Sequence, residues 1–285
     1  MDSKRKASNR VSIRLVQEAD SRQLTTLIDL GTYVHQHLDW RTPLDWVKHQ
    51  PYIVAELDHH LVAAMACPPD HPDVAWIRLF AVSPDISIKY AWSALWSAAR
   101  DQFSSSNVCV VAMPHQNWFR KLLESGAFVH SCDVVMLKWA GNRQPPVERH
   151  SACIIRPMEL DDLPAVQAVD SESFSPIWQN SLPLLKIALE RAAIATVAED
   201  ESGIIGYQIS TASAARGHLA RLAVHPGLQR RGVGYSLVQD LLTQFQRWGA
   251  LEITVNTQLD NQASLVLYEK AGFRRTDKIY PVYQT

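Results

Sequence analysis

Apolar residues recur along residues 153–285 with two different periods, which predict helices and strands in one domain. Between residues 231 and 248 they recur every three or four positions and form a single stripe, as on an amphipathic helix. Shorter apolar runs bounded by turn residues predict strands. The expected strands are Cys153–Arg156, Ile194–Glu199, Ile204–Ser210, Leu219–Val224, Leu251–Val255 and Lys278–Tyr283, and the expected helices are Asp161–Phe174, Trp178–Arg191, Arg231–Trp248 and Gln262–Lys270. This mixture of hairpins and strand–helix–strand units predicts an α+β fold.

The first half of the chain repeats part of this pattern. When the second half is shifted back by 142 positions, six of the 23 residues from Ala81 to Phe103 are identical to their counterparts, where chance gives about one or two. Pro84, for example, meets Pro226. A shift of 145 brings Phe128 onto Phe273. The two halves are therefore expected to be divergent copies of one domain.

A polar segment with a Pro-Pro pair, residues 141–150, lies at the midpoint and is typical of a linker. The expected domains are residues 1–140 and 151–285, which suits a length of 285 at roughly 150 residues per domain. The first ten residues carry four Lys and Arg and are expected to form a solvated start.

Charge and cysteine content exclude several classes of function. The 28 Lys and Arg nearly balance the 29 Asp and Glu, so no broad basic face for nucleic acid is expected. No apolar run is long enough to predict a membrane-spanning helix. The four cysteines form no C-x-x-C pair, so neither a zinc site nor a disulfide framework is expected, and a reducing cytoplasm suits them. They are Cys67, Cys109, Cys132 and Cys153.

The turn after the strand ending at Val224 is the strongest candidate for a binding site. The loop that follows leads into a helix with Gly232 and Gly234 at its start. A helix N-terminus offers unpaired N–H groups and a partial positive charge, which bind phosphate where no side chain blocks the approach. Arg230 and Arg231 would add charge at the rim. Close packing of helix on strand is the alternative explanation of the two glycines.

Two motifs in order resemble the GNAT superfamily of N-acetyltransferases. One is Gln-x-x-Gly-x-Gly after Leu-Ala-Val, and the other is the segment from Asp260 to Phe273. The resemblance covers Ile154 to Tyr283, and the whole chain is similar to tandem-GNAT proteins with a degenerate first copy. It implies two tandem GNAT-like domains, each a mostly antiparallel twisted sheet flanked by helices, with acetyl-CoA as co-substrate and no metal.

The resemblance also implies roles for individual residues. The strand residues Leu222, Ala223 and Val224 would lie along the pantetheine arm, with Leu222 and Val224 offering backbone groups. Asn261 would hydrogen-bond the pantetheine. Tyr268 would point its hydroxyl at the thioester sulfur. Main-chain N–H groups would wrap the pyrophosphate at Gln229, Arg230, Arg231, Gly232, Val233 and Gly234.

Thioester aminolysis needs a proton donor for the thiolate and an acceptor for the amine proton. A phenol with a pKa near ~10 can protonate a thiolate whose acid has a pKa near ~8.5, so Tyr268 is the expected acid. His218, six residues before Val224, is the expected base, with a partly exposed strand histidine as the alternative. Glu199 and Asp200 could act through a water, but a turn position explains them better.

The acceptor side is indicated by the aromatic pair Phe174 and Trp178, which would line the groove between the first two helices of the second domain. A packed helix–helix connection is the alternative. Relatives that acetylate ribosomal-protein N-termini place a glutamate near position 256, where this chain has Asn256. This difference argues against a ribosomal-protein acceptor.

The first half is expected to lack the site. Tyr90 and Trp92 stand where the glycines should be, and their rings would fill the phosphate position. Leu123 stands in place of Tyr268. The tryptophan-rich first half would then serve packing, or shape the acceptor site.

These observations predict a cytoplasmic acyltransferase whose second domain moves an acetyl group from acetyl-CoA to a primary amine of a small molecule or peptide. The amine would attack directly in a ternary complex. A non-catalytic acyl-CoA-binding regulatory or scaffold protein is the alternative. The sequence leaves the amine, the acyl chain length and the oligomeric state open.

Overall fold

The computed structural model describes residues 11–103, 107–140 and 153–285, and the expected linker and solvated start lie outside these ranges. The chain forms two compact units. Unit 1 comprises the chain up to Val129 together with Tyr283–Thr285, and unit 2 comprises His130–Val282. No helix in the described ranges is long and apolar enough to cross a membrane.

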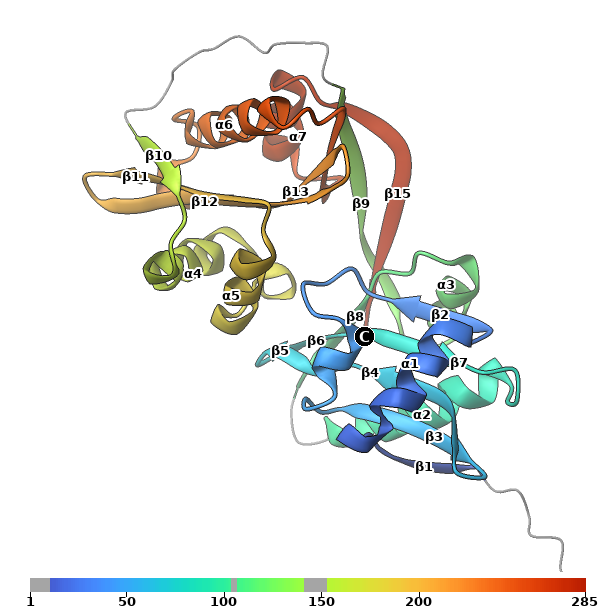
Figure 1. Ribbon diagram of the computed structural model, residues 1–285. Helices are drawn as coiled ribbons and strands as arrows, with labels where there is room; N and C mark the ends of the chain where they lie inside the picture. The colour runs from blue at the N-terminus through green and yellow to red at the C-terminus, as the bar shows by residue number, and fades with distance from the viewer. Residues whose placement is uncertain (1–10, 104–106, 141–152) are drawn as a thin grey trace, which may run out of the picture. The chain divides into compact units, whose positions relative to one another are not determined.

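Unit 2 is built on one sheet with the strand order β10-β11-β12-β13-β14-β9-β15. Its helices lie on both faces, with α6 and α7 on one side and α4 and α5 on the other (Figure 1). In chain order the elements are β9 (Val129–Ala140), β10 (Ile154–Pro157), η3 (Leu160–Asp162), α4 (Leu163–Ser173), η4 (Pro176–Trp178), α5 (Leu182–Arg191), β11 (Ile194–Asp200), β12 (Gly203–Ser213), β13 (Arg216–Val224), η5 (Pro226–Leu228), α6 (Val233–Arg247), β14 (Glu252–Gln258), α7 (Gln262–Lys270) and β15 (Arg274–Gln284).

The apolar stripe of α6 explains how this helix holds the sheet. Leu237, Val238, Leu241 and Phe245 are all buried. Gly217 on β13 makes the close approach possible, because a Cβ at that position would lie 2.8 Å from the ring of Phe245. The sequence therefore predicted this helix and its buried face correctly.

Strands β13 and β14 run parallel and then separate. They pair from Arg216 with Glu252 to Leu219 with Val255, and no pairing follows. Strand β13 nevertheless continues to Val224, where it still pairs with β12. The edge of β13 that faces β14 is therefore open over its last five residues.

Unit 1 has a separate five-stranded sheet with the order β1-β3-β4-β7-β2 and a second group of strands around β8. Its elements are β1 (Ser12–Leu15), η1 (Glu18–Asp20), α1 (Ser21–Leu30), β2 (Tyr33–Gln36), η2 (Pro43–Trp46), β3 (Tyr52–Leu57), β4 (His60–Ala66), β5 (Pro69–His71), β6 (Val74–Trp76), β7 (Leu79–Val82), α2 (Ile88–Gln102), β8 (Cys109–Ala112) and α3 (Asn117–Glu124).

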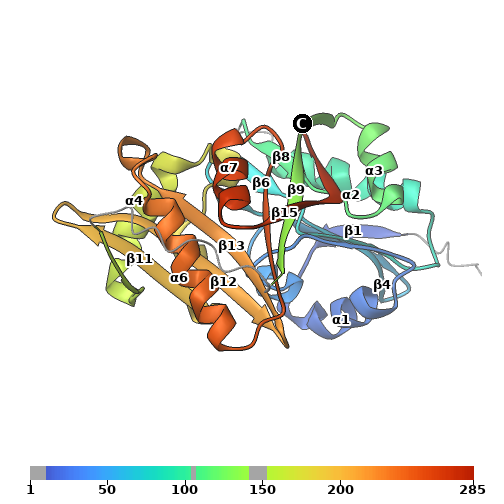
Figure 2. The same ribbon diagram turned by 90° about the horizontal axis from the view of Figure 1, so that it is seen from above.

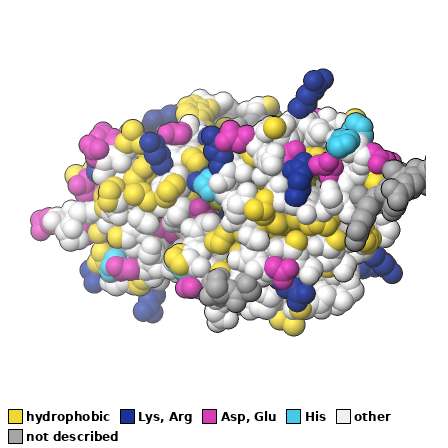
Figure 3. Space-filling model, turned by 90° about the horizontal axis from the view of Figure 1, so that it is seen from below, with side chains coloured by type: hydrophobic (Ala, Val, Ile, Leu, Met, Phe, Trp, Pro, Cys, Tyr) yellow, Lys and Arg dark blue, Asp and Glu magenta, His cyan; other side chains and the backbone are white. Residues whose placement is uncertain are grey.

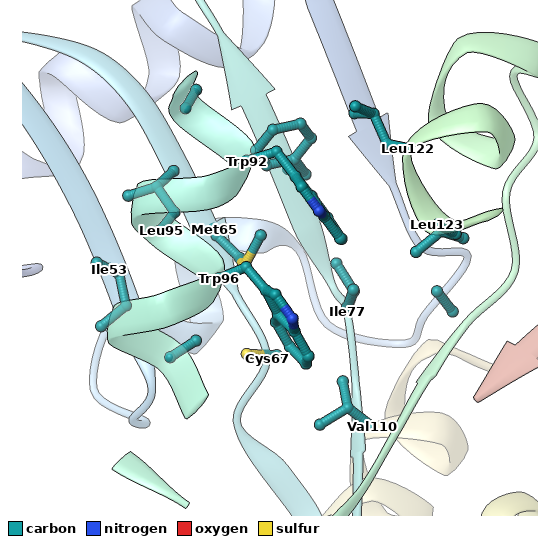
Figure 4. Close-up of a cluster of buried hydrophobic side chains, with 14 of the residues drawn as sticks. Ile53, Met65, Cys67, Ile77, Trp92, Leu95, Trp96, Val110, Leu122 and Leu123 are labelled. Atoms are coloured by element: carbon teal, nitrogen blue, oxygen red, sulfur yellow. The ribbon is translucent and has the colours of Figure 1, made fainter. Parts of the chain in front are cut away.

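An aromatic core fills the space between α2, α3 and the strands of unit 1. Trp92 is 7% exposed and points into this core, with its ring 5.9 Å from those of Trp96 and Phe119 (Figure 4). Tyr90 on the same helix is 48% exposed. The expectation that the Trp92 ring fills a phosphate position is therefore wrong, because that ring packs inside the unit.

A half-buried arginine network recurs in both units and supports the repeat. Arg14 donates to Asp20 and Glu56, and Arg156 donates to Asp162 and Glu199, with donor–acceptor distances of 2.7–2.9 Å in both. The arginines lie 142 residues apart, as do the aspartates. A register shift precedes the glutamate in both hairpins. The sequence analysis did not predict that these arginines and aspartates correspond.

Two strands cross the expected domain boundary. Strand β9, from the first half of the sequence, lies between β14 and β15 in the sheet of unit 2. The end of β15 pairs with β8 of unit 1, where Tyr283 meets Ala112 (Figure 2). The compact units divide after Val129 and after Val282, and not at the expected boundaries. The expected domains, residues 1–140 and 151–285, stay a prediction of the two duplicated segments.

Candidate functional site

The open edge of β13 presents the backbone of Leu222 and Val224. The N–H of His225 donates to the carbonyl of Ile205 on β12 at 2.9 Å. Backbone groups alternate in direction along a strand, so those of Leu222 and Val224 point away from β12, toward the space that β14 leaves. The carbonyl of Val224 already accepts the Ser173 hydroxyl and the Gln229 amide, each at 3.1 Å. The backbone groups of this edge that precede the Val224 carbonyl therefore remain available to a ligand.

The turn before α6 needs its glycine. Gly232 is the N-cap of α6 with φ +87°, a left-handed conformation that glycine adopts without strain. Arg230 also has a positive φ, +62°. The first helical hydrogen bond runs from the Ser236 N–H to the Gly232 carbonyl, so the N–H groups before Ser236 have no partner within the helix. These groups can serve an anion.

Gly234 has a packing role instead. A Cβ there would lie 3.3 Å from Leu267 on α7 and 3.6 Å from Val224. Each glycine thus fits one of the two explanations. Gly232 shapes the turn before α6, and Gly234 allows α6 to pack closely against α7 and β13. Arg230 and Arg231 are exposed beside the turn. Elsewhere, basic and acidic side chains are interspersed over the face in Figure 3, which agrees with the balanced charge.

Helix α7 carries the two residues expected to reach the pantetheine and the thioester. Asn261 is its N-cap, and its side-chain oxygen accepts the Ser264 N–H at 3.0 Å. Tyr268 is 4% exposed and packs with Phe273. Its hydroxyl makes no hydrogen bond within the described residues. Burial raises the pKa of Tyr268, so the phenol stays protonated at neutral pH.

His218 lies on the opposite face of the sheet from Tyr268. Its neighbour Leu219 belongs to the same buried cluster as Tyr268, and side chains alternate along a strand. The Nδ1 atom of His218 lies 2.9 Å from the Thr254 hydroxyl on β14. Burial lowers the pKa of His218, which keeps the ring neutral and able to accept a proton. His218 is one residue before the last pair of β13 with β14, which joins Leu219 and Val255.

Glu199 and Asp200 are occupied elsewhere. The Glu199 carboxylate accepts a hydrogen bond from the Arg156 guanidinium at 2.7 Å. The Asp200 carboxylate accepts hydrogen bonds from the backbone and the hydroxyl of Ser202 in the hairpin turn. Asp200 adjoins the turn as expected, whereas Glu199 lies within β11, where it pairs with Ile204.

The aromatic pair of the acceptor loop is partly engaged in packing. The ring of Phe174 lies 3.6 Å from the guanidinium carbon of Arg221. Trp178 ends η4, and both residues are half-buried. The loop between α4 and α5 thus lies against β13, as a groove-lining loop would.

A buried polar network beneath this loop was missed in the sequence. Asp170, fully buried on α4, accepts hydrogen bonds from Tyr207, from Arg221 at 2.8 and 2.5 Å, and from the Asn180 backbone at 2.9 Å. It ties the start of α5 to β12 and β13. An aspartate on the apolar side of a predicted helix was the available signal.

Unit 1 lacks the corresponding open edge. Strand β7, which ends at Val82 as β13 ends at Val224, pairs with β4 on one side and with β2 on the other. Tyr33 meets Val82, and His35 meets Phe80. Strand β2 therefore pairs with the edge of β7 that corresponds to the unpaired edge of β13 in unit 2. The connection to the next helix is also shorter, since α2 follows at Ile88, and Leu123 is buried in the core.

No three His, Cys, Asp or Glu side chains gather into a metal-holding group within residues 11–103, 107–140 and 153–285. All four cysteines are free thiols.

An open strand edge beside a glycine-capped helix suits an extended ligand that ends in phosphate, and a buried phenol near the gap suits acid catalysis. Residues 163–273 match the model of the Acetyltransferase (GNAT) family.

Curated relatives match part of the chain. N-alpha-acetyltransferase 30 of Schizosaccharomyces pombe is 35% identical over 68 residues, 24% of this chain and 45% of that protein. The [ribosomal protein bS18]-alanine N-acetyltransferase of Salmonella typhimurium is 24% identical over 130 residues, 45% of this chain and 86% of that protein. The chain spans under half the length of the N-alpha-acetyltransferase 30 proteins it matches, from 45% in the yeast down to 19% in Homo sapiens.

Solved structures extend the likeness of fold to the whole chain. A tandem GNAT protein from the clavulanic acid biosynthesis pathway covers 97% of this chain and 98% of its own, with a TM-score of 0.65 and 14% identity. A GCN5-related N-acetyltransferase from Sphaerobacter thermophilus covers 98% and 96%, with a TM-score of 0.62 and 16% identity. The expected α+β fold of two tandem GNAT-like domains is confirmed.

Proposed function

We propose that unit 2 transfers an acetyl group from acetyl-CoA to a primary amine of a small molecule or a peptide. The observation that carries this proposal is the open edge of β13, which lies beside the helix start capped by Gly232. The matching family and the N-alpha-acetyltransferase relatives support acetyl transfer and make a peptide N-terminus a reasonable acceptor.

The residues present fit acetyl-CoA along its length. The backbones of Leu222 and Val224, with the intervening Ala223, would hold the pantetheine arm as an added strand. The turn from Gln229 to Gly234 would bind the pyrophosphate through main-chain N–H groups, and Arg230 and Arg231 would add charge. The Asn261 side-chain oxygen is used by the helix cap, so only its amide N–H₂ would serve the pantetheine.

The reaction would be a direct aminolysis. The neutral amine would attack the thioester carbonyl carbon, a C–N bond would form, and the C–S bond would break. Tyr268 would donate its proton to the departing sulfur, and His218 would accept the proton lost by the amine nitrogen. The products would be an amide and the free CoA thiol. Phe174 and Trp178 would border the acceptor.

A thiol-release screen with acetyl-CoA across amines, polyamines, aminoglycosides and peptide N-termini tests the function. The expected result is release that depends on one class of amine and on Tyr268. Acetyl-CoA binding without release with any amine would contradict the proposal and favour the non-catalytic regulatory or scaffold protein. For such an enzyme we propose a cytoplasmic location, which the four free thiols support.

A further inference from the structure

Two arginines of unit 1 lie against one buried tryptophan. Trp46 is 1% exposed, and the guanidinium carbons of Arg41 and Arg78 lie 4.3 and 4.9 Å from the centre of its ring. Arginine is the cation found most often over an aromatic face, and this contact holds the guanidinium without a hydrogen bond. Trp46 therefore helps to fix the position of both guanidinium groups.

Two aspartates balance the charge of these arginines. Asp39 Oδ2 lies 3.0 Å from Arg78 Nη1 and accepts the indole N–H of Trp46 at 3.1 Å. Asp39 Oδ1 accepts the backbone N–H of Arg41 at 3.3 Å. Asp70 lies 3.5 Å from Nη1 of Arg41. Both oxygens of Asp39 are therefore used by groups other than Nε of Arg78.

Arg78 keeps one buried donor unused. Its Nε is buried and has no hydrogen-bond partner within the described residues, and the whole residue is 7% exposed. In contrast, Nε of Arg14 donates to Glu56 at 2.9 Å, and Nε of Arg221 donates to Asp170 at 2.8 Å. A buried donor without an acceptor costs free energy, so a native structure rarely keeps one without a reason. The missing acceptor points to a ligand.

A second buried group without a partner faces the same core. Tyr52 is fully buried in the cluster that contains Trp46, and its hydroxyl has no hydrogen-bond partner in the described parts of the chain. Burial raises the pKa of Tyr52, so the hydroxyl stays protonated and can donate. Tyr52 pairs with Ala66, whose carbonyl accepts the Arg78 N–H at 2.7 Å. Tyr52 and Arg78 thus lie on either side of one strand, β4.

We propose that unit 1 binds a small carboxylic acid whose carboxylate accepts the Nε–H of Arg78, with the Tyr52 hydroxyl as the second donor. A carboxylate has acceptors only, and it matches the edge of a guanidinium where Nε–H and one Nη–H point in parallel. A single negative charge is less costly to bury than the nearly double charge of a phosphate group, because the arginines and aspartates already balance.

Proton–nitrogen NMR of the full chain, labelled at arginine, tests this site. Titration with sodium acetate, against sodium chloride at equal ionic strength, should move the Nε–H resonance of Arg78 saturably. The expected Kd is about 10⁻³–10⁻² M for so small a probe. The Nε–H of Arg14, which already has Glu56 as its acceptor, is the internal control and should stay in place. No movement at Arg78, or an equal movement at Arg14, would overturn the proposal.

Tyr52→Phe tests the second donor while it keeps the buried ring. Loss of one hydrogen bond to a charged acceptor should weaken acetate binding about tenfold. Tyr33→Phe, on β2 of the same unit, is the matched control and should leave the Kd unchanged. The same Kd in Tyr52→Phe and in the wild type would overturn the assignment of two donors.

Sodium phosphate in place of acetate distinguishes the carboxylate from other anions. Phosphate should bind about tenfold more weakly, because it carries more charge into a buried site. Tighter binding of phosphate than of acetate would overturn the carboxylate assignment. These signals come from Arg78 in unit 1, so none of the outcomes depends on acetyl transfer by unit 2, which the thiol-release screen tests separately.

Discussion

Strands β7 and β13 hold the same place in the two repeats, but their outer edges differ. In unit 2 β14 turns away after Leu219 and leaves the rest of β13 unpaired on that side. In unit 1 the strand β2 pairs with β7 from Leu79 to Val82. The backbone groups available to a ligand in unit 2 are used internally in unit 1.

Under the proposed function, this difference would let one copy of the fold lose the site while it keeps its core. Arg14 and Arg156 donate hydrogen bonds of the same lengths to their aspartates, 2.7 and 2.9 Å in each unit, so this part of the scaffold is retained in both. What differs is the strand edge, the length of the following turn and the residue at Tyr268. We therefore expect unit 1 to be stable without binding acetyl-CoA.

The largest expected effect concerns β9, which fills the sheet of unit 2. A fragment of residues 151–285 lacks Val135, Leu137 and Trp139, all buried in the core of that unit. Core truncations cost about 2–5 kcal/mol each, against a usual total stability of about 5–15 kcal/mol. Thermal unfolding followed by circular dichroism should show no cooperative transition.

The matched control is the fragment 129–285, which retains β9 and should unfold cooperatively. A cooperative transition and normal acetyl-CoA binding in residues 151–285 would show that β9 is dispensable.

Tyr268→Phe tests the acid that unit 1 lacks. The change keeps the buried ring and removes only the proton donor. General acid catalysis contributes typically ~10²–10⁴ in rate, so kcat should fall by about that range while acetyl-CoA affinity stays constant. Steady-state kinetics and calorimetry on the same variant measure both. Tyr33→Phe in unit 1 is the control, and full activity in Tyr268→Phe would leave that residue a packing role only.

Gly232→Ala tests the turn that unit 1 lacks. A Cβ at φ +87° costs about 1–2 kcal/mol in backbone strain and should displace the N–H groups of the turn. Losing one charge-assisted hydrogen bond should weaken acetyl-CoA binding about tenfold. Gly249→Ala, at φ +74° beyond the other end of α6, carries the same strain and should leave affinity unchanged. Equal affinities in both variants would remove the turn from the site.

The smallest expected effect is a pH dependence of stability that comes from a buried histidine of unit 1. His35 on β2 is buried against Phe119 and beside His115 and Gln116, and burial lowers its pKa to about 3. The unfolded chain binds a proton near ~6.5 that the folded unit excludes, so stability is lost as pH falls below that value. Urea unfolding should show a loss of about 1 kcal/mol from this group between pH 6.5 and 5.5. His35→Phe should lack this part of the slope, and an identical slope in the variant would contradict it.

The sequence alone predicted much of unit 2. Periodicity located α6 and α7 closely, and the glycine turn marked the helix start. Tyr268 and His218 could be proposed because chemistry and resemblance agreed on the residue types. Their burial, and the faces of the sheet on which they lie, came only from the structure.

Non-local pairing explains what the sequence did not reveal. Val135, Leu137 and Trp139 alternate as on a strand, but nothing local shows that β9 pairs with β14 far along the chain. The same holds for the pairing of β2 with β7, which the sequence did not reveal. Asp170, Tyr207 and Arg221 meet from three elements, so no single segment could predict their network.

The number of acetyl-CoA molecules bound by the full-length protein tests the central comparison most directly. Calorimetric titration should give one site per chain, because β13 has a free edge and a glycine-capped helix beside it, whereas the corresponding strand β7 is paired on both sides. Gly232→Ala should weaken that one site. A stoichiometry of two would show that unit 1 binds despite β2, and no binding at all would refute the assignment of the site in unit 2.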